Sequence, residues 1–433
     1  MAEPDLDALF GEDNAEECSA PKVHPALLAA VKSLAAEAWP VARSELLGES
    51  DAAAVKVRLP LAPALARDVD LALEAMNAQD WSDCASKAAA IRKEAWNALM
   101  RDKGWQRPCD KELFMLVELI LALCAHASGS PATAVQHADG AFVFAAAGAF
   151  RSCALLFIRL LDDDARRAYQ AKENAVCGSF PDTPPLDASL SRSDSKKRLE
   201  RRPSPSPCEL VELLKLRRPF LFSHPDWPAA ARWKSLAYLD GNVGHRLIPA
   251  ELGAEVGAAS WREELIPFHR FLKEYLAPSC FEQTSSTAYL AQHELFEQCP
   301  VLRADIPVPS SWQEVLGPPT RCNAWIGTHS TLTPCHWDSY DNFLAQVQGF
   351  KRVALLAPEQ ASRLYVKAAT GTSAQGNISP VNVEDPDLAK YPEFAQAEVH
   401  LVDLSPGDVL FMPSGWWHQV RALSPSISVN FWY

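Results

Sequence analysis

Two histidines and an aspartate in the last quarter of the chain have the types and spacing of metal ligands. His336 and Asp338 stand two residues apart, and His418 follows in a Gly-Trp-Trp-His motif. Residues i and i+2 of a strand point to the same face, so the first two side chains can reach one ion while Cys335 and Trp337 point away. Two histidines and one carboxylate leave coordination positions open, as in non-haem Fe(II) oxygenases. An enzyme is therefore the leading hypothesis.

The third ligand has to come from a neighbouring strand. His418 follows an expected strand, Asp408–Met412, and a Pro-Ser-Gly turn, so we expect it on an adjacent antiparallel strand. A His-x-Asp pair alone is weak support, because most such histidines are buried and hydrogen-bonded for structural reasons. The third ligand and the flanking sequence favour a metal site.

Composition limits the class of protein. The chain has 433 residues, of which 48% are apolar and 22% charged, and its net charge is −13. This length suits about two globular domains. The negative charge argues against sequence-independent nucleic-acid binding, which needs clustered Lys and Arg. No uncharged apolar run of about 18 residues occurs, so we expect no membrane span.

The compartment follows from the amino terminus and the cysteines. The acidic start lacks the pattern of a secretory signal. Eleven cysteines are scattered singly without a Cys-x-x-Cys pair. Free thiols in a reducing compartment are then expected, which means the nucleus, the cytoplasm or both.

Four regions differ in texture, and together they predict an α+β protein. Residues 1–22 are acidic and predict a disordered tail. Residues 23–178 repeat apolar residues at three- and four-residue steps, as in 110–124 and 132–151, and predict an all-α N-terminal domain. Residues 179–207, rich in Pro, Ser and basic residues, predict a flexible linker. Residues 208–433 contain many short apolar runs separated by Pro/Gly turns, which favour a β-sandwich or barrel.

The linker contains a run of basic residues, Lys196–Arg202. Such a run can act as a nuclear-import signal. A solvated stretch of charge in a linker is at least as good an explanation, so the sequence leaves both open.

Three segments resemble one oxygenase family. Residues 323–358, 288–300 and 408–423 are similar to the JmjC (Jumonji-C) oxygenases, which are Fe(II)- and 2-oxoglutarate-dependent enzymes built on a double-stranded β-helix, a jelly-roll or cupin-like barrel. The similarity is greatest to the JmjC-only subgroup, which includes a peptidyl-arginine hydroxylase also described as a histone lysine demethylase. The order of a helical domain, a linker and a catalytic domain is also similar.

The resemblance assigns roles to individual residues. It implies that Fe(II) is held by three ligands: His336, Asp338 and His418. It implies that 2-oxoglutarate is bound by five residues: Tyr289, Thr333, Asn342, Lys351 and Trp432. It implies a substrate pocket with three lining residues: Glu251, Gln292 and Trp325. The stretch Ser339-Tyr340-Asp341 departs from the family pattern, which leaves the substrate-facing rim undefined.

The implied chemistry couples oxidative decarboxylation of 2-oxoglutarate, with O2 as the other co-substrate, to hydroxylation of a C–H bond. On a carbon next to a methylated nitrogen the resulting alcohol would collapse and demethylate. We favour arginine hydroxylation on a protein or basic peptide, because a carboxylate such as Glu251 suits a guanidinium and no second histone-reading module is evident. N-methyl-lysine demethylation is the alternative. A non-catalytic interaction scaffold is an alternative of another class, and a zinc hydrolase is a weaker one because it would need no carboxylate-binding lysine.

Overall fold

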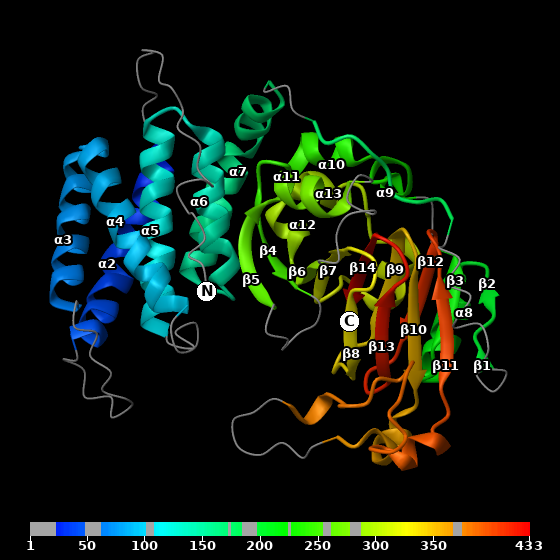
Figure 1. The fold of residues 1–433 in the computed structure, drawn as a ribbon. Helices are drawn as coiled ribbons and strands as arrows, with labels where there is room; N and C mark the ends of the chain where they lie inside the picture. The colour runs from blue at the N-terminus through cyan, green and yellow to red at the C-terminus, as the bar shows by residue number, and fades with distance from the viewer. Residues whose placement is uncertain are drawn as a thin grey trace. The chain divides into compact units, whose positions relative to one another are not determined.

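The computed structural model describes residues 23–47, 62–100, 108–171, 175–183, 197–223, 227–253, 261–277, 287–366 and 375–433. The predicted acidic tail, residues 1–22, lies outside these ranges. The chain divides into two compact units. The first contains the N-terminal helices together with residues 241–248 and 265–269, and the second contains the β-rich remainder (Figure 1).

The first unit is a stack of helices. They are α2 (Pro25–Leu47), α3 (Ala62–Ala78), α4 (Trp81–Met100), α5 (Pro108–Ala127), α6 (Pro131–Phe144) and α7 (Ala149–Gln170). Helix α5 packs against α2, α4 and α6, and it is apolar on nearly every side, as expected of a central helix. The predicted helical stretch 132–151 is divided in two, because Gly148 adopts φ +87°, a conformation that favours glycine.

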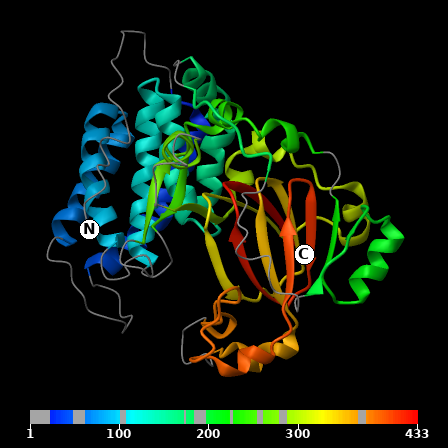
Figure 2. The same ribbon diagram turned by 45° about the vertical axis from the view of Figure 1, so that its right-hand side comes forward.

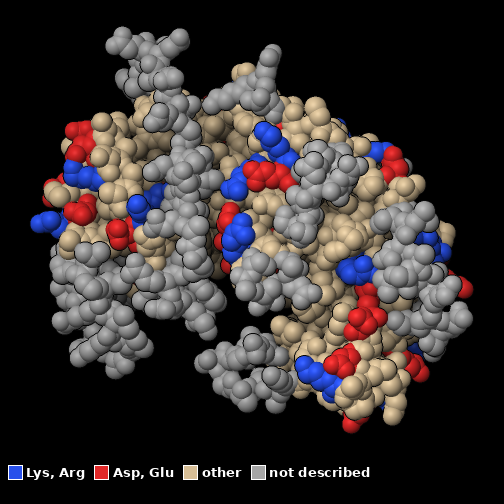
Figure 3. Space-filling model, in the orientation of Figure 1, with Lys and Arg blue, Asp and Glu red and all other residues tan. Residues whose placement is uncertain are grey.

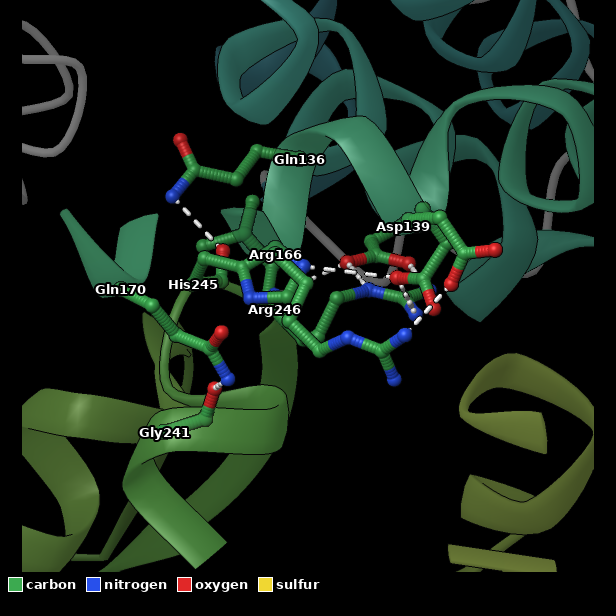
Figure 4. Close-up of polar contacts among 10 residues, drawn as sticks. Gln136, Asp139, Arg166, Gln170, Gly241, His245 and Arg246 are labelled. Atoms are coloured by element: carbon green, nitrogen blue, oxygen red, sulfur yellow. Dashed lines mark hydrogen bonds and ion pairs between the residues drawn. The ribbon is translucent and has the colours of Figure 1, made fainter. Parts of the chain in front are cut away.

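A buried ionic cluster joins residues 241–248 to α6 and α7 within this unit (Figure 4). The Arg246 guanidinium donates to both carboxylate oxygens of Asp139 and to Asp162, and both Arg246 and Asp139 are fully buried. The Leu247 amide also donates to Asp139. The Gln136 side chain also donates to the carbonyl of His245. The segment was expected to belong to the β-rich domain, and these contacts explain why it belongs to the helical unit.

Replacing Asp139 with alanine should destabilise the helical unit. The substitution leaves the Arg246 guanidinium buried beside a single remaining carboxylate, and removing one partner of a buried pair costs about 3–5 kcal/mol. Urea unfolding followed by far-UV circular dichroism would measure the loss. Asp163→Ala is the matched control, because the Asp163 side chain is 73% exposed and pairs with Arg166 at the surface; it should cost less than about 0.5 kcal/mol. Equal losses in the two variants would show that the contact between Asp139 and Arg246 does not stabilise the helical unit.

Two sheets form the framework of the second unit, although parts of β4 and β5 fall in residues 241–248 and 265–269 of the first unit. The five-stranded sheet has the order β1-β11-β10-β13-β8 and the nine-stranded sheet β2-β3-β12-β9-β14-β7-β6-β4-β5. The strands are β1 (Lys197–Arg198), β2 (Arg201–Arg202), β3 (Phe220–Ser223), β4 (Leu247–Leu252), β5 (Arg262–Pro267), β6 (Ala288–His293), β7 (Arg321–Gly327), β8 (Leu332–His336), β9 (Asn342–Gln348), β10 (Lys351–Leu356), β11 (His400–Leu404), β12 (Asp408–Met412), β13 (Trp417–Ala422) and β14 (Ser426–Trp432).

The chain crosses repeatedly between the sheets from β7 to β14, and neighbouring core strands are antiparallel. This is the topology of a double-stranded β-helix. Apolar side chains from both sheets meet in the interior, among them Leu344, Val353 and Leu410. The predicted order, a helical region followed by a β-rich barrel, is confirmed.

Shorter helices and turns accompany the strands. They are α8 (Pro207–Lys215), α9 (Pro228–Arg232), α10 (Leu236–Val243), α11 (Phe268–Phe271), a π-helix (Leu272–Leu276), α12 (Leu295–Gln298), α13 (Pro300–Arg303), α14 (Ser310–Leu316) and three 3-10 turns (Pro358–Leu364, Gln375–Asn377 and Pro392–Gln396).

The predicted linker differs from its expectation at its end. Residues 197–202 form two short strands: β1 pairs with β11 in one sheet and β2 with β3 in the other. Arg201 makes a two-bond contact with the buried carboxylate of Asp408. Residues 197–202 are therefore part of the barrel and not of a flexible linker. Lys196, the start of the candidate import signal, lies outside the described residues.

The described parts of the connection between β10 and β11, residues 357–366 and 375–399, pack on the outer face of the five-stranded sheet. They contribute Leu364, Val381 and Phe394 to a cluster that also contains Cys335 and Trp417 from the strands. In the two views of Figure 1 and Figure 2 this orange segment lies at one end of the sheets. Cys335 is fully buried in this outer cluster, so it points away from the barrel interior, as predicted.

On the face shown in Figure 3, basic and acidic side chains are interspersed over the residues that the structure describes. Within the described ranges, no helix is long and apolar enough to cross a membrane.

Candidate active site

A pocket with about 400 Å³ of empty space, part of it open to solvent, lies between the two sheets of the second unit. It is lined by ten of the eleven residues that the sequence singled out: Tyr289, Gln292, Trp325, Thr333, His336, Asp338, Asn342, Lys351, His418 and Trp432. Glu251 is the exception, and it lies beside the pocket.

The candidate metal ligands converge at one point. The Nε2 atom of His336 lies 3.7 Å from Asp338 Oδ1, and the Nε2 atom of His418 lies 3.6 Å from Asp338 Oδ2. These separations exceed ordinary hydrogen bonds. They suit atoms that share a cation, because two ligands each about 2.0–2.2 Å from one metal lie within about 4.4 Å of each other. Within the described ranges, this is the one His/Cys/Asp/Glu group with such a geometry.

Hydrogen bonds orient both imidazoles. His336 Nδ1 lies 2.8 Å from the carbonyl oxygen of Pro334, and His418 Nδ1 lies 3.1 Å from that of Trp416. A carbonyl only accepts, so each Nδ1 carries a proton, and Nε2 is the ring nitrogen turned to the shared point, where its lone pair could bind a metal. Burial, with His336 nearby, lowers the pKa of His418 to about 3, which keeps this imidazole neutral.

The backbone brings the ligands together through an irregular strand pair. His336 pairs with His418 between β8 and β13, as predicted for an adjacent antiparallel strand. Asp338 lies beyond the end of β8, not on the strand as expected. Between His418 and Val420 the register shifts, so Val420 pairs with Thr333 and β8 contains one extra residue. This bulge lets Thr333 and His336, three residues apart, both line the pocket.

Lys351 is the buried cation of the pocket. It is 2% exposed, and its ammonium nitrogen lies 5.5 Å from the centroid of the Tyr289 ring. Burial lowers its pKa to about 7. A tight turn at Gly349 positions it: φ is +67° and a Cβ atom there would lie 2.0 Å from the Pro425 carbonyl oxygen, so only glycine fits. Among the described residues no carboxylate forms an ion pair with Lys351, and a buried lysine of this kind suits an anionic ligand.

Other polar atoms of the pocket also lack partners within the described part of the chain. They are Asn342 Oδ1, Asn430 Nδ2 and Trp432 Nε1, all buried. Buried polar groups are normally hydrogen-bonded. Two imidazoles, a carboxylate, a buried ammonium and unpaired amide groups therefore fit a metal together with a small oxyacid.

An aromatic and acidic surface borders the same pocket. The rings of Tyr289 and Trp325 are 6.0 Å apart, and Trp325 donates to Asn430 Oδ1 at 3.0 Å. Glu251 pairs with Tyr289 across β4 and β6, so both side chains lie on one face. Burial and then Glu263 raise the pKa of Glu251, while the indole of Trp261 lowers it.

Several of these residues were missed by sequence reasoning. Asn430 stands two residues before Trp432 on β14, so strand alternation would have placed it on the same face. Trp261 offered no such signal, because it is brought to Glu251 only by the pairing of β4 with β5. Tyr340 was noted only as a departure from the family pattern, and its ring stacks on Trp432 at 5.1 Å and 7°.

Fold and site together define a double-stranded β-helix protein with a two-histidine, one-carboxylate group in its barrel. Residues 205–433 match the family model described as a cupin-like domain, and the chain belongs to this family. It is similar to JmjC domain-containing protein F of Dictyostelium discoideum, 36% identical over 48% of this chain and 55% of that protein.

Two further relatives are lysine-specific demethylase 8 of Xenopus tropicalis (38% identical, 48% of this chain and 45% of that protein) and Jumonji C domain-containing protein 5 of Drosophila melanogaster (35%, 48% and 52%). The expected resemblance to JmjC proteins is confirmed. The chain spans about half the length of the curated relatives it matches.

Proposed function

We propose that this chain is an Fe(II)- and 2-oxoglutarate-dependent oxygenase that hydroxylates a protein side chain, with arginine as the preferred residue. The observation that carries the proposal is the buried Lys351 ammonium in the pocket that also holds His336, Asp338 and His418. A metal hydrolase needs the three ligands but not a buried cation for a second carboxylate.

Each residue has a defined task in this proposal. The Nε2 atoms of the two histidines and the Asp338 carboxylate would hold the metal, which supplies O2 activation when it is bound together with 2-oxoglutarate. Lys351 neutralises the distal carboxylate of the co-substrate. Thr333 and Tyr289 lie beside it, and the phenol stays protonated because burial raises its pKa well above the ordinary value. Asn342 and Trp432 complete the wall on the other side.

The preference for arginine rests on the acidic and aromatic border. Glu251 and the indoles of Trp261 and Trp325 form the combination that suits a planar guanidinium, through paired hydrogen bonds and stacking. Gln292 adopts φ +49° at the rim of the pocket, a strained conformation of the kind found at functional sites. N-methyl-lysine demethylation remains the second candidate, supported by the names of relatives such as lysine-specific demethylase 8.

Mass spectrometry of a peptide panel tests the proposal. Arginine- and methyl-lysine-containing peptides are incubated with the full chain, Fe(II), 2-oxoglutarate and ascorbate, with His336→Ala as the blank. Gain of one oxygen on arginine supports hydroxylation, and loss of a methylene mass from methyl-lysine supports demethylation. Neither shift, with succinate no higher than in the blank, contradicts an oxygenase and favours the scaffold.

Glu251→Gln should weaken use of an arginine peptide. The amide keeps the shape but removes the charge, and a hydrogen bond to a charged group contributes about 1.5–3 kcal/mol, so kcat/KM should fall about tenfold to a hundredfold. Glu393→Gln, at an exposed glutamate of the same unit, should stay within twofold of wild type. If both variants behave alike, Glu251 does not bind the substrate.

Tyr340→Ala should raise the KM for 2-oxoglutarate about twofold to tenfold, because an aromatic pair contributes about 0.5–1.5 kcal/mol and this one supports the Trp432 wall of the pocket. Tyr340→Phe preserves the stacked ring and should restore the wild-type value. Steady-state succinate formation at varied 2-oxoglutarate gives both constants. A fall in kcat alone, or no rescue by phenylalanine, would show that the ring does not position Trp432.

A further inference from the structure

Ile378 stands directly across from a candidate metal ligand. It forms an antiparallel bridge with His336. The two hydrogen bonds of the bridge belong to the flanking residues: the Trp337 amide donates to Asn377 at 3.1 Å, and the Ser379 amide donates to Cys335 at 2.8 Å. His336 and Ile378 are therefore a non-hydrogen-bonded pair, whose side chains lie on the same face at about 4.5–5.5 Å between Cβ atoms.

This pairing extends a row of side chains. His418 is the partner of His336 on its other side. Three neighbouring segments thus present His418, His336 and Ile378 in one line on the same face. His418 and His336 line the pocket, and Ile378 stands next to them outside it. The two histidines hold the metal in the proposed function, and Ile378 is the next residue outward.

The Ile378 side chain is exposed although its backbone is fixed. It is 46% exposed. On either side of it, the side-chain amide of Asn377 donates to the Trp337 carbonyl at 3.1 Å, and the Ser379 hydroxyl donates to the Leu364 carbonyl at 2.7 Å. A single exposed apolar residue is common on protein surfaces, and Leu388 is equally exposed. The register with the ligand row is what distinguishes Ile378.

Strand spacing indicates which group meets this side chain. Adjacent segments lie about 4.8 Å apart, so Ile378 stands one spacing outside His336 and about 10 Å outside His418. A side chain that reaches the ligands from this edge has to cross that distance over Ile378. Arginine and lysine have the length, and their methylene stems pack on apolar surface while the charged end extends further.

We propose that Ile378 is a substrate-contact residue and that the aliphatic stem of a long cationic side chain packs against it on the way to the metal ligands. The inference rests on the proposed function and adds a contact to it. It predicts that a short side chain at the target position is a poor substrate, because it cannot span the distance from the edge.

The test compares Ile378→Ala with Leu388→Ala and Ile378→Val in the full chain. The probe is a peptide of the arginine and methyl-lysine panel that the wild-type chain modifies. Peptide turnover of each protein is divided by its own succinate formation without peptide, which corrects for differences in iron or co-substrate loading. Ile378→Ala removes the apolar surface that the aliphatic stem would cover, so we expect it to lose about fivefold to tenfold in kcat/KM, mainly through KM.

Ile378→Val should recover most of this loss, and Leu388→Ala should match the wild-type chain. If Ile378→Ala and Leu388→Ala match each other while the wild-type chain modifies the peptide, the contact inference is wrong and the proposed function stands. If the wild-type chain modifies no peptide of the panel and forms no succinate above the His336→Ala blank, the proposed function fails and the inference fails with it.

Discussion

Asp338→Ala should abolish 2-oxoglutarate turnover. The substitution removes the one anionic ligand of the trio, and its two oxygens face both imidazoles. Changing even an outer partner of a metal ligand costs about tenfold to a hundredfold in metal affinity or activity, so loss of the ligand itself should exceed about a hundredfold. Succinate formation and bound iron by elemental analysis would measure the two effects together.

Asp403→Ala is the matched control, because Asp403 pairs with Arg352 on β10 at the exposed side of the same sheet. It should keep turnover within twofold. A scaffold would behave differently, since Asp338→Ala would then leave its partner binding and its biological effect intact. Full turnover in Asp338→Ala would contradict the metal site.

Lys351→Met should weaken binding of 2-oxoglutarate without destabilising the fold. Truncating one partner of a buried, hydrogen-bonded charge pair costs about 2–5 kcal/mol, because the other charge is left buried and unpaired. The KM for 2-oxoglutarate should therefore rise by more than about 30-fold. Methionine fills a similar volume without a charge that has to be buried. The free energy of unfolding without ligands should therefore stay equal or increase, which chemical denaturation would measure. Lys390→Met, at an exposed lysine that also lies over a tyrosine ring, should change neither quantity.

Because the pKa of Lys351 is low, both the stability of the fold and the affinity for 2-oxoglutarate should depend on pH. In the folded chain without ligands the pKa of Lys351 is about 7. In the unfolded chain the pKa of a lysine is about 10.4. Below pH 7 Lys351 is protonated in both the folded and the unfolded chain, so burial of its charge destabilises the fold by the largest amount. As pH rises from 7 towards 10, the folded chain loses this proton first and the destabilisation decreases. Binding of the dianionic co-substrate needs the charged form, so its affinity should fall as pH rises above 7. Calorimetric titration at pH 6.5 and 8.5 would test this, and Lys351→Met should lose the dependence.

Much of the site was predictable from the sequence because its residues lie on short, strongly patterned strands. Short apolar runs between Pro/Gly turns predicted the β-rich domain, including the strand Asp408–Met412, which is β12. The two-residue period of a strand placed Cys335 on the outer face. The resemblance then pointed to Lys351 and Trp432, which do line the pocket with the ligands. The helical character of residues 23–178 followed from apolar spacing, since that spacing records which face of each helix is buried.

The tertiary structure alone decided the features that depend on pairing between distant segments. The extra residue in β8 turns Thr333 to the same side as His336, and strand alternation by itself predicts the opposite. Arg201 leaves the expected linker because Asp408, 207 residues away, accepts its guanidinium. Ile378 lies on the same face as His336 because its segment pairs with the end of β8. A local pattern specifies which side chains share a face, but register between strands is set by long-range hydrogen bonds and packing, and these exist only in the folded chain.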